Sequence, residues 1–536
     1  MANYTMRADG TAASLAACTD GDPAVISECM DVATHNSLMG SIAAGSVIQL
    51  ADTGGVYRAI LQPANGSSGN NIVYEAYSGD TPILSGSDLI GDIWSTSGGN
   101  LWETTASITT APMQVFIDGQ FGDRKTSSGA CVNEYDWYWA SNVLYLYATG
   151  DPYTEYTTPG VEAGQRDYCV FDESNTFFTL DGLTAVHSQV VGLRATYCDE
   201  VVMKNCIVEW NYRWGIQFRE TDDCVAEDNI ARYNGENGVA FHQHMDGARC
   251  LRNKCYGNNK YQSYEIDSNL RWRAGIRIYP SEQTATDVLV KDNECYDNGY
   301  SGSLSGQGVG IWLDGNYNAT SDITISENYC HDNYGQGLYL EISRNTDCFD
   351  NVVINNGLSS ATNNGNVEIR TWGVYIAENV NFHNNTCVGG YYGLDCHTQD
   401  EEAACRFQNN SIRNNIITGA SSGINLLVFA GAGNTGSYGS GNVYRTNCFG
   451  AEDTAFISWN GTTYNTYDAW LAASSQADDN VEADPVFTDA GGDDYSHDSS
   501  SPCVGAAANL GSPFNQGLLP ASTWTDGVVT GDRDSY

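Results

Sequence analysis

The sequence predicts an all-β fold, a solenoid in which short strands stack coil upon coil, and three observations lead to this prediction. First, the pattern Gly, apolar, any, apolar, any returns nine times, and such period-two alternation is typical of a strand with one buried face. Second, the spacing of about 20 to 37 residues is typical of repeats that bury their inner faces against each other. Third, Asn and small apolar residues recur at fixed places in these coils. The nine strands begin at Gly192, Gly215, Gly238, Gly275, Gly310, Gly337, Gly373, Gly393 and Gly423.

Residues 1–110 are predicted to form an N-terminal cap and the first, less regular coils. Four short apolar stretches, separated by turn residues, favour four strands here. From 111 to 165, alternating aromatic residues such as those of Leu144–Tyr147 predict a small β insertion beside the solenoid. The four stretches are 45–50, 55–61, 71–77 and 82–86.

Residues 166–450 are predicted to form the regular coils. Each coil carries an Asn, a residue that accepts the backbone of a tight turn and can hydrogen-bond to the Asn of the next coil. Cys residues share one repeat position with small hydrophobes, so we expect an inward stack of buried thiols. The Asn column is Asn229, Asn253, Asn293, Asn328, Asn351, Asn385 and Asn415, and the stack contains Ala231, Cys255, Cys295, Cys330, Val353, Cys387 and Ile417.

Residues 451–536 are predicted to form the last coils and a C-terminal cap, with one short helix near 464–471. Between some coils the chain has extra residues, at 257–273, 299–308 and 357–371. Loops of this length on a solenoid tend to border its binding face.

The opening of the chain resembles that of right-handed parallel β-helix carbohydrate enzymes of the pectin-lyase-like superfamily. The resemblance lies in Gly54–Arg58, Tyr74–Tyr77 and Ile83–Gly86, followed by the Trp-Tyr strand at Trp137, and in the closing segment after residue 450. It implies a right-handed parallel β-helix with an N-terminal cap, a small β insertion and a C-terminal capping segment.

The composition restricts the partners. Lys and Arg number 24 against 66 Asp and Glu, which gives a formal net charge of -42. Such a surface repels nucleic acid and anionic membranes. No apolar run approaches the ~20 residues of a membrane span, and no signal peptide is visible. We expect no nucleic-acid or membrane partner and an extracellular or virion-associated location.

One face of the predicted solenoid concentrates side chains that bind ligands. The second and fourth residues after each Gly are expected to point away from the core, and we call these two columns the outer stripe. In its middle the outer stripe is rich in Arg, His, Tyr, Trp, Asp and Glu, whereas a merely solvated face would be filled with Ser, Thr, Asn and Lys. The predicted substrate-binding residues are Arg219, His242, Arg277, Tyr279, Trp312, Tyr339 and Tyr375.

Asp314 and Glu341 occupy the same stripe position on consecutive coils. Adjacent strands lie ~4.8 Å apart, close to the ~5–5.5 Å between the carboxyl groups of a retaining glycosidase. Such proximity should raise the pKa of one of the two groups. The arrangement resembles that of β-helical retaining xylosidases, which implies Asp314 as nucleophile and Glu341 as acid/base, although the roles could be exchanged.

The sequence therefore predicts a carbohydrate-active enzyme that binds a polysaccharide or oligosaccharide, in the first place a glycoside hydrolase that requires no cofactor. One alternative is a polysaccharide lyase, in which Arg219, His242, Arg277 and Tyr279 act on a uronate while Asp314 and Glu341 hold calcium. Another alternative is a non-catalytic glycan-binding or tailspike-like virion protein that binds a glycan with the same outer stripe.

Overall fold

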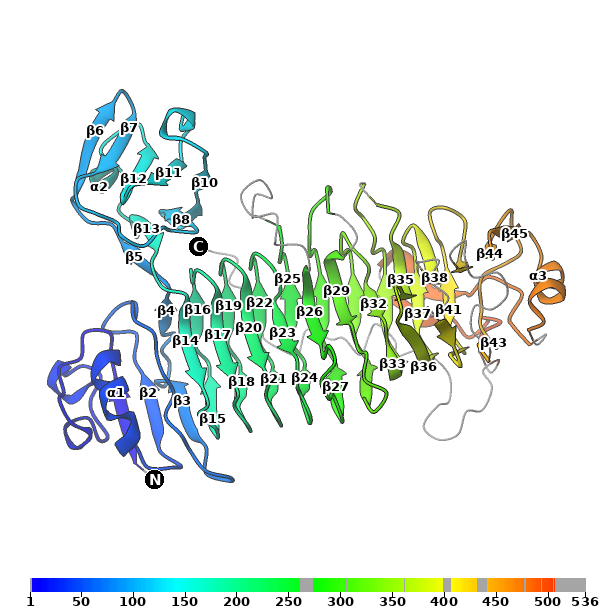
Figure 1. Ribbon diagram of the computed structural model, residues 1–536, viewed down its shortest axis with the longest axis horizontal. Coiled ribbons are helices and arrows are strands. Elements are labelled where there is room, and N and C mark those ends of the chain that lie inside the picture. Colours follow the sequence, from blue (N-terminus) through cyan, green and yellow to red (C-terminus); the bar gives the residue numbers. More distant parts are fainter. Residues whose placement is uncertain are drawn as a thin grey trace.

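The computed structural model describes residues 2–260, 273–303, 306–360, 362–398, 406–430, 441–476, 479–492, 494–504 and 506. In this part of the chain, parallel coils stack into a rod, and a small antiparallel unit projects near its N-terminal end (Figure 1). Three long parallel sheets form the walls of the rod. The predicted all-β, right-handed parallel β-helix is confirmed.

The sheet that carries the outer stripe has twelve strands among the described residues, and all but its last pair run parallel. In order, these strands are β14 (Tyr168–Glu173), β17 (Val191–Thr196), β20 (Trp214–Arg219), β23 (Val239–His242), β26 (Arg273–Tyr279), β29 (Gln307–Asp314), β32 (Leu338–Glu341), β35 (Gly365–Thr371), β38 (Tyr392–Thr398), β42 (Leu426–Ala430), β44 (Ile457–Trp459) and β45 (Thr462–Tyr464).

The other two walls are a fourteen-stranded and a ten-stranded sheet over the same described ranges. The fourteen-stranded sheet contains β1 (Asn3–Met6), β2 (Val47–Leu50), β3 (Ile72–Ala76), β15 (Phe178–Asp181), β18 (Val202–Lys204), β21 (Val225–Glu227), β24 (Arg249–Leu251), β27 (Val288–Lys291), β30 (Ile323–Ser326), β33 (Arg344–Phe349), β36 (Ile376–His383), β39 (Arg406–Gln408), β40 (Ser411–Arg413) and β43 (Val443–Arg445). The ten-stranded sheet contains β4 (Ile83–Ser85), β16 (Thr184–Val186), β19 (Ile207–Glu209), β22 (Ile230–Arg232), β25 (Lys254–Tyr256), β28 (Glu294–Tyr296), β31 (Tyr329–His331), β34 (Val352–Ile354), β37 (Thr386–Val388) and β41 (Ile416–Thr418).

The bore of the rod is filled by one continuous hydrophobic core, which runs from Tyr4 to Trp470. The predicted inward stack is part of it: Cys255, Cys295 and Cys330 pair in register on β25, β28 and β31, and each is fully buried. Burial raises the pKa of the Cys387 thiol farther along the same stack. The thiols therefore behave as small hydrophobic side chains.

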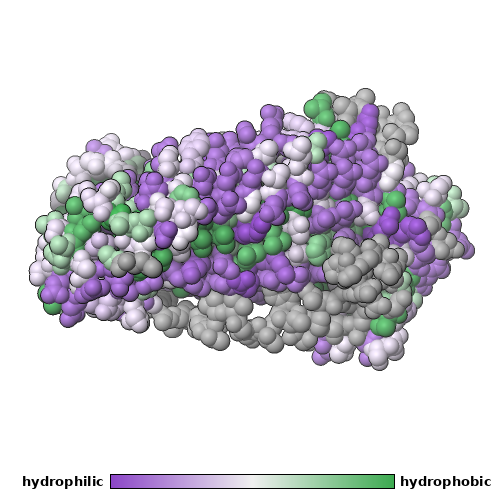
Figure 2. Space-filling view, turned by 90° about the horizontal axis from the view of Figure 1, so that it is seen from below, coloured by the Kyte–Doolittle hydropathy of each residue, from purple (hydrophilic) through white to green (hydrophobic). Residues whose placement is uncertain are grey.

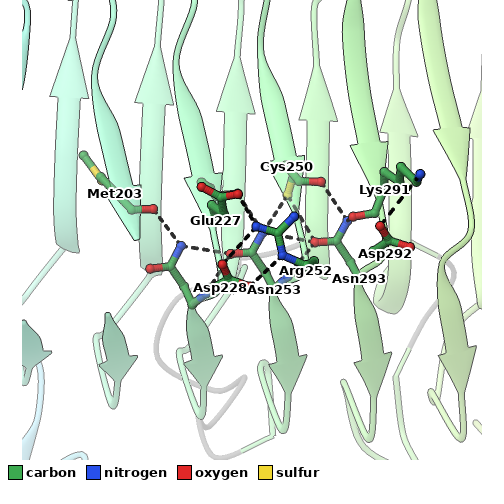
Figure 3. Close-up of polar contacts among 11 residues, drawn as sticks. Met203, Glu227, Asp228, Cys250, Arg252, Asn253, Lys291, Asp292 and Asn293 are labelled. Atoms are coloured by element: carbon green, nitrogen blue, oxygen red, sulfur yellow. Dashed lines mark hydrogen bonds and ion pairs between the residues drawn. The ribbon is translucent and has the colours of Figure 1, made fainter. Parts of the chain in front are cut away.

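Asparagine amides link the coils, as predicted. The Nδ2 atom of Asn253 donates to Asn293 Oδ1 at 3.0 Å (Figure 3). The Nδ2 atom of Asn293 in turn donates to Asn328 Oδ1 at 2.9 Å. The same amides also bind backbone carbonyls of the preceding coil, such as that of Cys250. Because each amide is buried and bonded on both sides, the ladder satisfies polar groups that the turns would otherwise leave unpaired.

The register of the coils differs from the prediction after Glu341. Gly373 does not begin a strand of the stripe: its φ of +60° places it in a turn, and β35 ends at Thr371. The coil instead uses residues 365–371, which the sequence suggested as an insertion, with Val367 and Ile369 inward. Asn366 stands where other coils have Gly, and it continues an Asn ladder by accepting a bond of 2.8 Å from Asn356.

The small unit near the N-terminus contains one five-stranded and one four-stranded sheet among the described residues, and all but one of its strand pairs run antiparallel. It includes β6 and β7, which the sequence placed with the first coils. Its core is separate from that of the rod and is built around Trp137. Its strands are β5 (Ser87–Leu89), β6 (Trp94–Gly98), β7 (Leu101–Thr104), β8 (Val115–Ile117), β9 (Gln120–Phe121), β10 (Asp123–Arg124), β11 (Asp136–Ala140), β12 (Val143–Tyr147) and β13 (Val161–Gly164).

Of the four strands predicted before residue 90, three form, as β2, β3 and β4. The stretch 55–61 contributes only isolated bridges, at Tyr57 and Leu61. The helices are α1 (Val32–Leu38), α2 (Pro152–Glu155) and α3 (Tyr467–Ser474), and α3 is the predicted C-terminal helix. Near the C-terminal end, β46 (Phe487–Asp489) pairs with β47 (Asp494–His497). No helix among the described residues is long and apolar enough to cross a membrane. Seen from below, the rod presents a largely hydrophilic face (Figure 2).

Candidate active site

Asp314 and Glu341 lie opposite each other on the neighbouring strands β29 and β32. Each is the last residue of its strand, and each is less than a tenth exposed. Because parallel neighbours are ~4.8 Å apart, the two carboxyl groups face the same small space outside the bore. The predicted pair is therefore brought together.

Arg277 on β26 binds the carboxylate of Asp314. Its Nε atom donates to Asp314 Oδ2 at 2.9 Å, and its Nη2 atom binds the same oxygen. Both groups are largely buried, so the ion pair is shielded from solvent. A guanidinium remains charged at all ordinary pH values, so this contact gives Asp314 a permanent cationic partner.

Glu341 has a different environment. Burial and the nearby charge of Asp314 raise the pKa of Glu341 to about 8, although a hydrogen bond from Trp372 and the charge of Arg370 oppose the rise. The bond from Trp372 Nε1 to Glu341 Oε1 is 2.8 Å long. At neutral pH the site therefore holds a protonated Glu341 next to the carboxyl group of Asp314, which Arg277 binds.

Trp312 and Tyr339 do not present their faces to a ligand, which corrects one prediction. Their rings stack at 5.3 Å beside the carboxyl pair, but Trp312 is fully buried and Tyr339 is 3% exposed. Ala274 and Val309 complete a small hydrophobic cluster around them outside the main core. These aromatic side chains support the floor of the site rather than offering a sugar-stacking surface.

Tyr375 lies outside the outer stripe because β35 ends before it. Its ring stacks on Tyr317 at 4.3 Å and meets Trp372 edge-on at 5.5 Å. Trp372 is 37% exposed. Burial is the largest cause of the raised pKa of Tyr317, followed by Tyr279 and Tyr375, and the charges of Asp314 and Glu341 add to it. Tyr317, Trp372 and Tyr375 thus form an accessible aromatic group beside the carboxyl pair. The prediction missed Tyr317 and Trp372 because both follow the ends of strands.

Arg219, His242 and Tyr279 lie on the coils that precede the pair, as predicted. Arg219 pairs in register with His242, and His242 pairs with Tyr279. The rings of His242 and Tyr279 meet edge-on at 5.7 Å, and Arg277 lies over the Tyr279 ring at 4.9 Å. Burial and four nearby arginines lower the pKa of His242 well below its usual value, so its imidazole is neutral.

A second set of charged residues follows the pair on β35 and β38. Glu368 is paired in register with Tyr339 and with Asp395, and Arg370 is paired with Glu341 and with His397. Burial and the charge of Asp395 raise the pKa of Glu368. The sequence missed Glu368 and Arg370 because residues 357–371 were expected to be a loop, although the alternation of Val367 and Ile369 was a usable signal.

The metal alternatives have different support. At the carboxyl pair, Arg277 already occupies one oxygen of Asp314, and Arg370 is in register with Glu341, so the two cations partly compensate the charge that calcium would bind. Elsewhere, Asp222, His244 and Asp246 offer ligand atoms within 4.8 Å of one another. His244 Nε2 is 2.8 Å from Asp222 Oδ1, and His244 Nδ1 is hydrogen-bonded to Thr284 at 2.6 Å. Hydrogen bonds alone account for this second arrangement.

Comparisons with known proteins agree with this architecture. Residues 155–316 match the family described as right handed beta helix region. The structure of XylC in complex with xylose is similar with a TM-score of 0.57 at 14% identity, over 78% of this chain and 76% of that chain. Comparison with curated protein sequences finds no match.

Two further solved structures share the general form at lower similarity. One is described as a glycoside hydrolase, with a TM-score of 0.45 at 9% identity over 84% of this chain and 97% of that one. The other is the pectate lyase Pel9A, with a TM-score of 0.43 at 14% identity over 87% of each chain. Likenesses at such identities show the fold alone. The chain thus has the fold of a right-handed parallel β-helix, and residues 155–316 match the family model of that region.

Proposed function

We propose that this protein is a carbohydrate-active enzyme, a glycoside hydrolase that cleaves a polysaccharide or oligosaccharide. The observation that carries the proposal is the difference between two adjacent carboxyl groups. Arg277 forms an ion pair with Asp314, while burial and the charge of Asp314 raise the pKa of Glu341 to about 8. Different environments of two neighbouring carboxyl groups assign one of them as base or nucleophile and the other as acid. The similarity to the complex of XylC with xylose supports a sugar substrate.

The proposed reaction retains configuration. Protonated Glu341 gives its proton to the glycosidic oxygen as the bond breaks, and Asp314 attacks the anomeric carbon. Both contacts of Arg277 fall on Oδ2, so Oδ1 of Asp314 is the oxygen that attacks. Glu341, now ionised, then takes a proton from water, which hydrolyses the glycosyl ester. The strand spacing of ~4.8 Å suits this double displacement better than the ~6.5–9.5 Å of inverting enzymes.

The aromatic group beside the pair would bind the sugar ring. Trp372 is exposed while its Nε1 atom holds Glu341, so one side chain can both position the acid and contact the substrate. Tyr375 and Tyr317 extend the apolar surface next to it. Flat apolar rings of this kind offer large contact area with a polar edge.

A second candidate function is a polysaccharide lyase, and the neutral state of His242 favours it. Burial and arginines keep the His242 imidazole unprotonated, next to Tyr279. A neutral imidazole can abstract the proton next to a uronate carboxylate while arginine neutralises that carboxylate. In this alternative the Asp314–Glu341 pair would have no chemical role.

Incubation of the protein with a panel of glycans distinguishes the hydrolase from the lyase. New reducing ends report cleavage, and ultraviolet absorbance reports the unsaturated uronates that a lyase produces. We expect reducing ends without new absorbance. Glu341→Gln should abolish turnover, whereas Glu294→Gln, which changes a carboxylate on the ten-stranded sheet, should retain it.

New absorbance would contradict the hydrolase proposal and support the lyase. Full turnover by Glu341→Gln would remove this residue from the mechanism whatever the reaction. Binding without any cleavage across the panel would leave the protein as a non-catalytic glycan receptor and would contradict both enzymatic functions.

A further inference from the structure

We infer that Arg194, Arg219 and His242 form a subsite for the acidic group of a substrate sugar, on the coils that precede the Asp314–Glu341 pair. The inference rests on the proposed function, because it assigns a substrate class, acidic glycans, to the same face. The shared chemistry is an anionic group, either a carboxylate or a sulfate ester. Four observations support it.

The first observation is the distribution of charge. The chain has only 24 basic residues and a net charge of -42, yet arginines gather on one face over β17, β20 and β26. From β17 to β26, one column of the outer stripe contains Arg194, Gln217, Ala240 and Arg277. The other column contains Thr196, Arg219, His242 and Tyr279. None of these eight is a carboxylate, so this part of the face is locally positive in a strongly acidic protein.

The second observation is that, among the described residues, Arg194 has no ion-pair partner and Arg219 has only a loose one, Glu220 at 3.7 Å. Arg213 is paired with Glu236 at 3.0 Å, and Arg277 with Asp314. In contrast, the side chain of Arg194 donates to neutral hydroxyl groups within the described ranges, those of Thr196 at 3.0 Å and Tyr168 at 2.9 Å.

Arg219 is similar to Arg194. It donates to the amide oxygen of Gln243 at 2.7 Å, while the carboxylate of Glu220 remains at 3.7 Å, longer than a hydrogen bond. Its side chain is 40% exposed, so the guanidinium is open to a ligand. The positive charge left on Arg194 and Arg219 is available to an anion.

The third observation is a set of buried polar atoms without a hydrogen-bond partner at the same place. They are Trp214 Nε1, Gln217 Oε1 and His242 Nε2. The Trp214 and His242 rings meet edge-on at 5.3 Å, and Gln217 lies between Arg194 and Ala240 in the register. Since buried polar groups are normally hydrogen-bonded, two potential donors and one acceptor converging here indicate a ligand with its own oxygen atoms.

The fourth observation is continuity with the carboxyl pair. Tyr279 contacts His242 on one side and Arg277 on the other, and Arg277 binds Asp314. His242 on β23 is two strand spacings from Asp314 on β29, about 10 Å. A glycan that lies along the stripe would therefore place an acidic sugar at Arg219 and His242 while another of its sugars lies at the pair.

The test is calorimetric titration of Glu341→Gln, in which the proposed cleavage is blocked, with acidic oligosaccharides and their uncharged counterparts. The probes are an oligogalacturonate, an oligomannuronate and a glucuronate-substituted xylo-oligosaccharide, each with its carboxyl-reduced form. A carrageenan oligosaccharide and its desulfated form distinguish sulfate from carboxylate. We expect at least one acidic probe to bind about tenfold or more tightly than its uncharged form.

The variant Arg219→Gln, made in the same background, should remove most of that preference and leave the affinity for the uncharged form unchanged. Arg219→Lys should recover part of it, because the charge is kept. The matched control is Arg252→Gln, an arginine of similar exposure that binds Glu227 and Asp228 at the fourteen-stranded sheet (Figure 3). The control should retain the full preference.

Equal binding of acidic and uncharged probes, absence of binding by every acidic probe, or an unchanged preference in Arg219→Gln would each overturn the inference. Failure of the proposed function looks different. An acid preference that depends on Arg219, in a protein that cleaves no glycan, would keep the subsite and contradict the hydrolase. Cleavage that depends on Glu341, in a protein that does not prefer acidic probes, would support the hydrolase and contradict the subsite.

Discussion

The two carboxyl groups on the neighbouring strands β29 and β32 have different immediate neighbours. Asp314 receives a guanidinium, whereas Glu341 receives an indole N–H and the negative charge of Asp314. The sequence predicted the pair and the rise of one pKa from the register alone. It did not predict Trp372, because that residue reaches Glu341 from a turn after the strand, where period-two alternation carries no information.

The raised pKa of Glu341 predicts a pH-dependent loss of stability. Between the unfolded value of about 4.5 and the folded value of about 8, the folded protein binds more protons than the unfolded chain, so its free energy of unfolding falls as pH rises. The loss is complete above pH 8 and amounts to a few kcal/mol. Urea unfolding at pH 5 and pH 8.5 should show a larger decrease for the wild type than for Glu341→Gln. An equal decrease of the free energy of unfolding in both proteins would contradict the raised pKa of Glu341.

Trp372→Phe tests the hydrogen bond that holds Glu341. The bond lowers the pKa of Glu341, so its loss should raise that pKa and move the basic limb of the kcat/KM profile to higher pH. The phenyl ring preserves the contact with Tyr375, and the partly exposed position should leave stability nearly unchanged. A basic limb that stays in place, or moves to lower pH, would show that Trp372 does not tune the acid.

At the scale of the element, each coil combines an alternating strand with a turn that an Asn closes. The Gly pattern located most strands of the stripe, and the Asn column located the turns. Two errors of register arose. At one coil Asn366 replaces Gly and Gly373 forms a turn instead. At the last coil of the pattern, Leu426 rather than Ile424 pairs with Leu394, and Gly423, with a φ of +82°, does not begin the strand. A Gly therefore predicts the start of a strand reliably only where the neighbouring turn is also recognised. At the first of these coils, the Asn ladder predicts the register better than the Gly pattern does.

Asn293→Ala should destabilise the rod by about 2 to 4 kcal/mol, because it leaves several buried partners without their hydrogen bonds. These partners are Asn253, Asn328 and the carbonyls of Cys250 and Lys291. Chemical denaturation measures the loss. Asn70→Ala is the control, since Asn70 is exposed and its amide binds one local carbonyl. Similar effects of both substitutions would contradict a structural role for the ladder.

At the scale of the whole molecule, stacking produces long, nearly uniform walls, and the candidate site occupies a few coils of one wall. The architecture could be predicted from the sequence because every coil repeats the same solution for burying its inner face. The site could be predicted only in part, because the side chains that complete it lie in turns between coils, where the repeat does not constrain the sequence.

The net charge of -42 predicts that salt stabilises the protein at neutral pH. Mutual repulsion of surface carboxylates opposes the compact state, and added ions screen it. The melting temperature should be higher in 0.5 M than in 0.02 M sodium chloride at pH 7, and this difference should shrink near the isoelectric point of about 4.2. A melting temperature that does not respond to salt at pH 7 would mean that local ion pairs compensate the net charge.

The central claim is that Asp314 and Glu341 act as nucleophile and acid/base at the separation of neighbouring strands. The most direct measurement is proton NMR of the anomeric region during the first minutes of cleavage of a glycan identified by the panel. The account predicts that the first product has the anomeric configuration of the substrate, before mutarotation. A first product of inverted configuration, or one with an unsaturated ring, would contradict it.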